Sequence, residues 1–328
     1  MVVTLRDVAR EAGVSASAVS RSFTAGAPVP AETRARVREV ADRLGFRPNR
    51  LASGLTSGRT GLIALAVHDL GDPMVLAGLQ GATRRLAAAG CTPLLVDLGG
   101  AAEPASVIAP VRDYRAEAVL LMAPHLPPAF ARALTGAGLV VGRAFGRAMA
   151  RSPMPQAGID HAEAARLAAR ILTGRGYRDL VCLVGPDAPA ARRDLEDGFT
   201  HMAERAGARV RPIRASGWTV AAGARALATD LARARPPDAV FAADPRLARG
   251  AARALAAAGL GVPRDVGLLA LDCAEAPGGP SALALPCAEI AGTAADLLLR
   301  MLADREAEAT SLVLPVVFTD RGTLRPEP

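Results

Sequence analysis

The chain has 328 residues, 51% of them apolar, so it can bury a large core spread over two or three domains. Its formal net charge is +7, and every basic residue is an arginine. Residues 1–60 carry ten Arg against five Asp and Glu, a net of +5, which leaves +2 for the other 268 residues. An arginine-rich genome would explain the missing lysines but not this asymmetry. The asymmetry favours a small nucleic-acid-binding module joined to a larger one.

The N-terminus is charged where a signal peptide needs an apolar stretch, and no run approaches eighteen uncharged apolar residues. We therefore expect a cytoplasmic protein without a membrane segment. Four cysteines lie far apart without a C-x-x-C pair, which predicts free, buried thiols and no structural zinc site. They are Cys91, Cys182, Cys273 and Cys287.

Residues 4–12 and the stretch 13–21 predict two short helices joined by a tight glycine turn. Thr4 and Asp7 approximate a capping box at the first helix, and Gly13 is suited to end it in the left-handed conformation. Ser15 is a good N-cap for the second helix. A third helix is expected over 31–46. Together these elements predict a helix-turn-helix unit.

The second helix, in "GVSASAVSR", has small polar residues on one face, as a helix that enters the major groove of DNA requires. We expect Ala16 and Ser17 near base edges and Ser20 and Arg21 one turn further, in reach of phosphates or a guanine edge. Arg6, Arg34 and Arg50 are expected to contact the DNA backbone. A helix-glycine-helix pattern by itself also occurs in helical proteins that bind no DNA.

The stretches "VTLRDVAREAGVSASAVSR" and "VPAETRARVREVADRLGFRPNRLASGL" resemble the DNA-binding headpiece and hinge of the LacI/GalR family of bacterial transcription regulators, nearly unbroken over residues 3–61. The resemblance implies a homodimer on a pseudo-palindromic double-stranded DNA operator. It also implies a hinge and linker at 48–60, in which 48–55 forms a short helix only on DNA, with the leucine matching Leu55 wedged into the minor groove. The residues expected at the DNA are Thr4, Leu5, Arg6, Ser15, Ala16, Ser17, Ser20, Arg21, Thr33, Arg34, Asn49, Arg50, Ala52 and Leu55.

After residue 60, short apolar runs alternate with alanine-rich helical stretches, which indicates buried parallel strands and crossover helices. The predicted strands are 61–67, 92–98, 117–123, 139–142, 180–185, 238–243 and 266–272. This pattern predicts an α/β domain of two doubly wound parallel-sheet subdomains behind an all-α headpiece. The resemblance implies a periplasmic-binding-protein-like effector domain. We expect a headpiece at 1–47 and an effector and dimerisation domain at 61–328, with one subdomain at about 61–156 and 288–315 and the other at about 157–287 and 316–328.

Ligands of doubly wound sheets bind at the carboxyl ends of the strands, hence between the subdomains. Trp218 stands where the family often carries an aromatic residue that stacks on a sugar, and it could instead be a packing anchor. The other candidates lie near predicted strand ends or helix starts and could instead be exposed or ion-paired surface residues. They are Asp72, Arg143, Arg193, Asp244 and Asp272.

The resemblance implies a small effector, most simply a sugar or sugar derivative, that changes operator affinity and repression. Several polar residues common in the family are absent here, with Leu195, Ala243 and Cys273 in their places, so the identity of the effector stays open.

An enzyme is not expected. "GAGLVVG" at 136–142 lacks the third glycine of a dinucleotide fingerprint, and the four histidines have no partners at metal-ligand or triad spacing. We therefore expect no cofactor and no metal. The alternative function is a cytoplasmic solute-binding protein of the same fold without ligand-controlled DNA binding, which the headpiece opposes.

Overall fold

The computed structural model describes residues 3–24, 26–47, 60–99, 103–123, 126–147, 152, 154–186, 189–273, 279–304 and 306–327. The chain divides into two compact units, residues 1–60 and 61–328. Among the described residues, no helix combines the length and the apolar character needed to cross a membrane.

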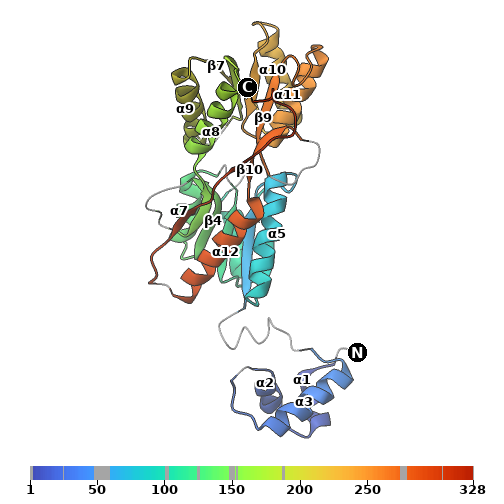
Figure 1. Cartoon of the computed structure of the whole chain (residues 1–328). Coiled ribbons are helices and arrows are strands. Elements are labelled where there is room, and N and C mark those ends of the chain that lie inside the picture. The colour runs from blue at the N-terminus through green and yellow to red at the C-terminus, as the bar shows by residue number, and fades with distance from the viewer. Residues whose placement is uncertain are drawn as a thin grey trace. The chain divides into compact units, whose positions relative to one another are not determined.

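In its described part, residues 3–24 and 26–47, the first unit is a helix-turn-helix module whose helices surround a small core (Figure 1). Val8, Val19 and Val37, one from each helix, are fully buried at its centre. Gly13 ends the first helix at a positive φ of 66°, as expected for a left-handed cap. The helices are α1 (Leu5–Ala12), α2 (Ala16–Phe23) and α3 (Ala31–Leu44).

The second unit contains two six-stranded sheets, one per subdomain (Figure 1). The sheet of the first subdomain is parallel throughout, in the order β11-β5-β4-β3-β1-β2. Its strands are β1 (Leu62–Val67), β2 (Thr92–Asp97), β3 (Ala118–Met122), β4 (Val141–Arg147), β5 (Gln156–Ile159) and β11 (Ser311–Val313). Its helices are α5 (Pro73–Ala88), α6 (Ala105–Asp113), α7 (Pro128–Gly136) and α12 (Cys287–Ala303).

The sheet of the second subdomain has the order β12-β10-β9-β8-β6-β7, and only the edge strand β12 is antiparallel to its neighbour. Its strands are β6 (Asp179–Val184), β7 (Arg209–Arg214), β8 (Ala239–Ala242), β9 (Gly267–Cys273), β10 (Ser281–Leu285) and β12 (Val317–Thr319). Its helices are α8 (His161–Gly174), α9 (Pro189–Arg205), α10 (Val220–Leu231) and α11 (Pro245–Ala257).

The seven predicted strands are all present, and the described residues contain further strands that were not among those seven. The central strands are apolar throughout because both faces of a parallel sheet are covered by helices. The missed β7, "RVRPIR", is an edge strand that carries three arginines, so it lacks that signal. β5 pairs with β4 and β11, which places 156–159 in the first subdomain. The strand therefore lies at the boundary that is expected at about residue 156.

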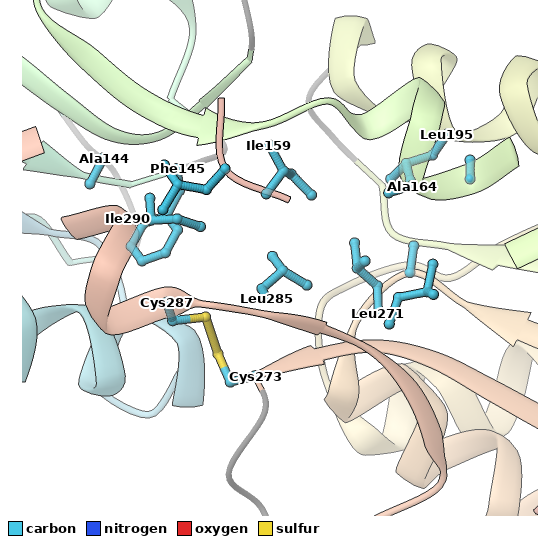
Figure 2. Close-up of a cluster of buried hydrophobic side chains, with 14 of the residues drawn as sticks. Ala144, Phe145, Ile159, Ala164, Leu195, Leu271, Cys273, Leu285, Cys287 and Ile290 are labelled. Carbon is cyan, nitrogen blue, oxygen red and sulfur yellow. A yellow bond between two sulfur atoms is a disulfide. The ribbon is translucent and has the colours of Figure 1, made fainter. Parts of the chain in front are cut away.

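A continuous apolar cluster joins the two subdomains (Figure 2). It contains Phe145 and Ile290 from the first subdomain and Leu271 from the second. At its edge, Cys273 at the end of β9 and Cys287 at the start of α12 form a disulfide.

The expectation of four free, buried thiols is thus wrong for this pair, because the fold brings together two residues that are 14 positions apart. Cys182 is a buried free thiol whose pKa is raised by its burial, whereas Cys91 is only half-buried.

Candidate DNA-binding helix and subdomain junction

Helix α2 presents an exposed polar face. Ser15 caps the helix by accepting a hydrogen bond from the Ala18 N–H at 3.2 Å, and its hydroxyl lies 2.9 Å from that of Ser17. The buried side of the helix is formed by Val19 and Ser22. The predicted base-contacting residues Ala16, Ser17, Ser20 and Arg21 are all exposed. This helix therefore offers hydroxyls and one guanidinium to a partner, without bulky side chains in front of them.

Two other residues expected at the DNA have structural roles in the headpiece. The Thr4 hydroxyl and the Asp7 carboxylate form the predicted capping box of α1, in which the Thr4 N–H donates to Asp7 at 3.0 Å. The guanidinium of Arg34, which is expected to contact the DNA backbone, donates within the headpiece to the carbonyls of Ser22, Thr24 and Ala27 at 2.8, 3.1 and 2.7 Å. These bonds fasten the loop between α2 and α3.

The remaining expected DNA contacts divide into two groups. Arg6 is exposed, while Leu5 packs partly against the headpiece core and Thr33 is half-buried. The other candidates lie outside the described residues. They are Asn49, Arg50, Ala52 and Leu55.

At the junction of the subdomains, two helices begin with the same Asp-Pro pair. Asp72 caps α5 of the first subdomain by accepting from the Met74 N–H at 2.9 Å. Asp244 caps α11 of the second subdomain by accepting from the N–H groups of residues 246 and 247 at 2.7 and 3.3 Å. Proline suits the first helical position because no intrahelical acceptor exists there for an N–H. The sequence thus places a carboxylate at each helix start.

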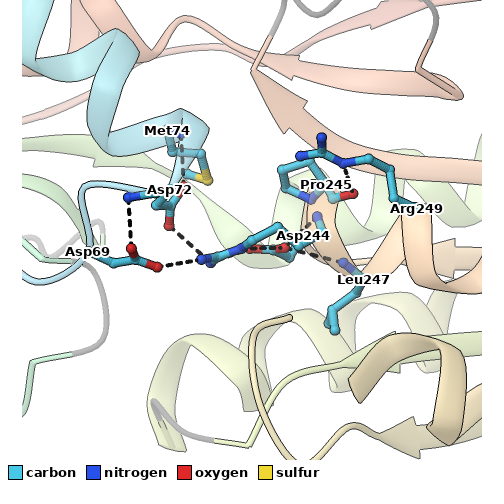
Figure 3. Close-up of polar contacts among 9 residues, drawn as sticks. Asp69, Asp72, Met74, Asp244, Pro245, Leu247 and Arg249 are labelled. Atoms are coloured by element: carbon cyan, nitrogen blue, oxygen red, sulfur yellow. Dashed lines mark hydrogen bonds and ion pairs between the residues drawn. The ribbon is translucent and has the colours of Figure 1, made fainter. Parts of the chain in front are cut away.

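Arg246 joins these carboxylates. Figure 3 shows Asp69, Asp72 and Asp244 together with the polar contacts at this junction as dashed lines. Its Nη2 lies 3.0 Å from the carboxylates of both Asp72 and Asp244, and its Nη1 lies 2.9 Å from that of Asp69. Asp69 and Asp72 follow β1 in the first subdomain, whereas Asp244 and Arg246 follow β8 in the second. We call these four residues the Arg246 cluster. One guanidinium therefore bonds to carboxylates of both subdomains.

Burial dominates the electrostatics of the cluster. The side chains of Asp72 and Asp244 are 1% and 4% exposed, whereas that of Asp69 is 43% exposed. Burial raises the pKa of Asp72, and the nearby Arg246 offsets only part of this effect. Burial would lower the pKa of Arg246, but hydrogen bonding to Asp244 and the surrounding negative charges outweigh it and raise that pKa. Burial also lowers the pKa of the neighbouring His68, which favours its neutral form.

Asp272, another predicted effector residue, lies beside the cluster in a cavity of about 360 Å³. Pro73 and Pro245, which follow the two capping aspartates, are part of the same wall. Asp272 is buried, and its Oδ1 has no hydrogen-bond partner among the described residues. The nearest guanidinium nitrogen, from Arg321, is 3.9 Å from Oδ2. Burial therefore raises the pKa of Asp272.

The other three effector candidates occupy different surroundings. Trp218 packs over Gly185 at the end of β6, where any added side chain would collide with the indole ring. Arg143 is half-buried in β4 and donates to the carbonyl of Leu126 at 3.2 Å. Arg193 is exposed on α9. The Arg246 cluster thus contains two of the six sequence-predicted residues, Asp72 and Asp244.

Comparisons with known proteins decide the family. Residues 4–49 match the model of the bacterial regulatory proteins of the lacI family, and residues 169–324 match that of the periplasmic binding protein-like domain. The HTH-type transcriptional regulator PtxS of Pseudomonas aeruginosa is 30% identical over 332 residues, which cover 99% of this chain and 96% of PtxS. The chain belongs to the lacI family of bacterial regulatory proteins.

Other relatives agree with this placement. The lactose operon repressor of Escherichia coli is 26% identical over 331 residues, covering 98% of this chain and 90% of the repressor. The crystal structure of the Lac repressor dimer bound to operator and an anti-inducer has the same fold, with a TM-score of 0.86, 23% identity and coverage of 98% and 99%. This lacI-family chain is thus a DNA-binding transcription regulator with a periplasmic-binding-like effector domain, and its relatives are regulators rather than enzymes.

Asp69 and Arg246, at the junction of the subdomains of this lacI-family protein, were not predicted from the sequence. A usable signal was the repeated Asp-Pro pair at 72–73 and 244–245, which marks two capped helix starts near strand ends. An arginine two positions after Asp244 can reach a group of the other subdomain that faces the start of the helix. The identity of that partner depends on which loops the two sheets bring together.

Proposed function

We propose that this regulator is a homodimer that binds a pseudo-palindromic operator through one headpiece per half-site and represses transcription. The observation that carries the proposal is the exposed polar face of α2, with Ala16 and Ser17 near its start and Arg21 one turn further. A single module of this size offers few base contacts, so two are needed for useful specificity.

Exposed apolar side chains on the first subdomain support a dimer. Leu76 of α5 is 48% exposed and Leu95 of β2 is 50% exposed. These two elements pack against each other, so both leucines belong to one region of the subdomain. Burying such residues against a second copy would remove apolar surface from water. Sedimentation of the full chain would test for a dimer.

We also infer that a small ligand, most simply a sugar or sugar derivative, binds between the subdomains and changes operator affinity. One structural neighbour, 26% identical with a TM-score of 0.70, is a complex of the regulator CelR with cellobiose. Trp218 is proposed as the residue that stacks on the ligand, with Asp272 accepting from a hydroxyl. A coupling of about 1–3 kcal/mol is typical for such regulation.

The deciding experiment maps genomic binding sites of the full chain and then measures its affinity for one mapped site. A chain shortened to begin at residue 61 is the control and should not bind. Sugars are then screened by thermal shift, and a true effector should raise the melting temperature of the wild type but not of Trp218→Ala. A full chain without sequence preference for DNA would favour the solute-binding alternative.

A further inference from the structure

The Arg246 cluster links the two subdomains through side chains of the protein alone. Asp69 and Asp72 come from the turn before α5, and Asp244 and Arg246 come from the start of α11. The four contacts between the guanidinium and the three carboxylates are between 2.9 and 3.2 Å long. A ligand bound between two subdomains also links them, because it forms hydrogen bonds to both.

The geometry points to Arg246 as a specificity-determining residue that acts as a tethered ligand: its guanidinium fills a cation site shared by both subdomains and holds them together before any effector arrives. A molecule can take this place only if it supplies several hydrogen-bond donors and carries no negative charge there. The inference rests on the proposed function only in assuming that an effector enters this junction.

The burial of the carboxylates supports this role. Asp72 and Asp244 are almost completely buried and lie on opposite subdomains, each within 3.0 Å of the same nitrogen of Arg246. Without a cation between them, two buried negative charges would face each other in a region of low dielectric, where repulsion is strong. Separating the subdomains would let water reach both carboxylates. The guanidinium therefore favours the closed arrangement.

The planar shape of the guanidinium also matters. Nη1 donates to Asp69, Nη2 donates to both Asp72 and Asp244, and Nε donates to Asp244. One planar guanidinium therefore donates to three separate carboxylates. A lysine ammonium is a single point of charge and cannot reach all three carboxylates with the same geometry. This predicts that shape, as well as charge, is selected at the site.

Helix α11 provides a matched control. Arg249 lies one turn after Arg246 on the same helix, but it is exposed and its Nε donates within the helix to the carbonyl of Pro245 at 3.4 Å. Arg249→Ala removes the same charge from the same helix without touching the cluster. Any effect of the total charge of the protein should therefore appear in both variants.

The test uses the full chain without DNA and without effector, and guanidinium ion at up to about 10 mM as the probe. Arg246→Ala should lower the melting temperature, and guanidinium should raise it again in a saturable manner. At ten times the Kd, the recovery should be about 2–4 °C. Urea, which has a similar shape but no charge, and sodium chloride should have no such effect. The wild type and Arg249→Ala should not respond to guanidinium.

Small-angle X-ray scattering on the same samples measures the separation of the subdomains. Arg246→Ala should have a larger radius of gyration than Arg249→Ala, and guanidinium should reduce it. If Arg246→Ala does not fold, the double variant Asp69→Asn with Asp72→Asn replaces it. That variant keeps an oxygen acceptor to cap α5 and leaves Asp244 paired with Arg246. The two subdomains of this variant should also move apart, which would increase its radius of gyration.

The proposal would be overturned by an Arg246→Ala protein that is as compact as Arg249→Ala, or by one that opens but does not respond to guanidinium. A response to urea equal to that to guanidinium would overturn it as well. Operator affinity is measured separately, so a failure of operator binding would count against the proposed function without affecting these results.

Discussion

The guanidinium of Arg246 lies 3.0 Å from the carboxylate of Asp72, although 174 positions separate the two residues in the chain. This ion pair joins the start of α11 to the start of α5, and Asp72 is only 1% exposed. Because breaking a buried pair leaves a charge without a counterion, its loss should be costly.

Arg246→Met should therefore reduce the free energy of unfolding by about 3 kcal/mol, because Asp72 and Asp244 lose their shared cation while the apolar stem is kept. Asp69→Asn should cost less than about 1 kcal/mol, since its carboxylate is 43% exposed and solvent screens the interaction. Urea denaturation of both variants gives the comparison. Equal losses in the free energy of unfolding for the two variants would contradict the conclusion that the buried ion pairs of Arg246 with Asp72 and Asp244 are stronger than its pair with Asp69.

Asp272 should reduce stability at neutral pH. Burial raises its pKa above the usual 3.8, so the folded state disfavours the ionised carboxylate that predominates at pH 7. This penalty is present above the raised pKa and is relieved as the pH falls through it toward 3.8. Asp272→Asn should be more stable than the wild type near pH 7, by an amount that shrinks on acidification. Denaturation at a series of pH values measures this difference, and a gap that widens toward low pH would refute the explanation.

The disulfide between Cys273 and Cys287 should stabilise the effector domain. It closes a loop of 14 residues, for which the entropy of the unfolded chain predicts about 3 kcal/mol. Cys273→Ser should therefore melt at a lower temperature than the oxidised wild type, and a reductant should lower the melting temperature of the wild type but not that of Cys273→Ser. Cys91→Ser is the control, because Cys91 is outside this disulfide. Mass spectrometry of alkylated protein shows which cysteines are paired.

Arg21→Ala should weaken binding to a mapped operator by about 1–3 kcal/mol if Arg21 makes a bidentate contact to a base. Arg43→Ala is the control in the same headpiece, because Arg43 is exposed on α3 and pairs with Glu11 at 3.1 Å. Fluorescence anisotropy at one fixed salt concentration measures both affinities, since salt alone changes such values strongly. An Arg21→Ala protein with wild-type affinity would remove Arg21 from the interface.

Exchanging Ala16 and Ser17 should change operator preference more than overall affinity, because these small exposed residues stand at the start of α2 and contribute little to the headpiece core. Binding-site selection from random DNA, compared with the wild type, measures the preference. An unchanged consensus would indicate that the two residues do not face the bases.

Local sequence alone determined much of this protein. The caps of α1 and α2, the core side of α3 and the alternation of buried strands with helices depend on residues within a few positions of one another, so patterns in the chain predict them. The starts of α5 and α11 at Asp-Pro pairs also depend only on neighbouring residues. The edge strand β7 escaped prediction because a half-exposed strand does not need the continuous apolar pattern.

Only the tertiary structure decided how distant groups meet. Asp72 and Asp244 were predicted near a common site, but their link through Arg246 depends on the order of strands in two sheets and on the loops that follow β1 and β8. The pairing of Cys273 with Cys287 depends likewise on where β9 ends and α12 begins. Such contacts follow from chain topology, because the charge or thiol of a residue does not specify which distant partner the packed sheets will place beside it.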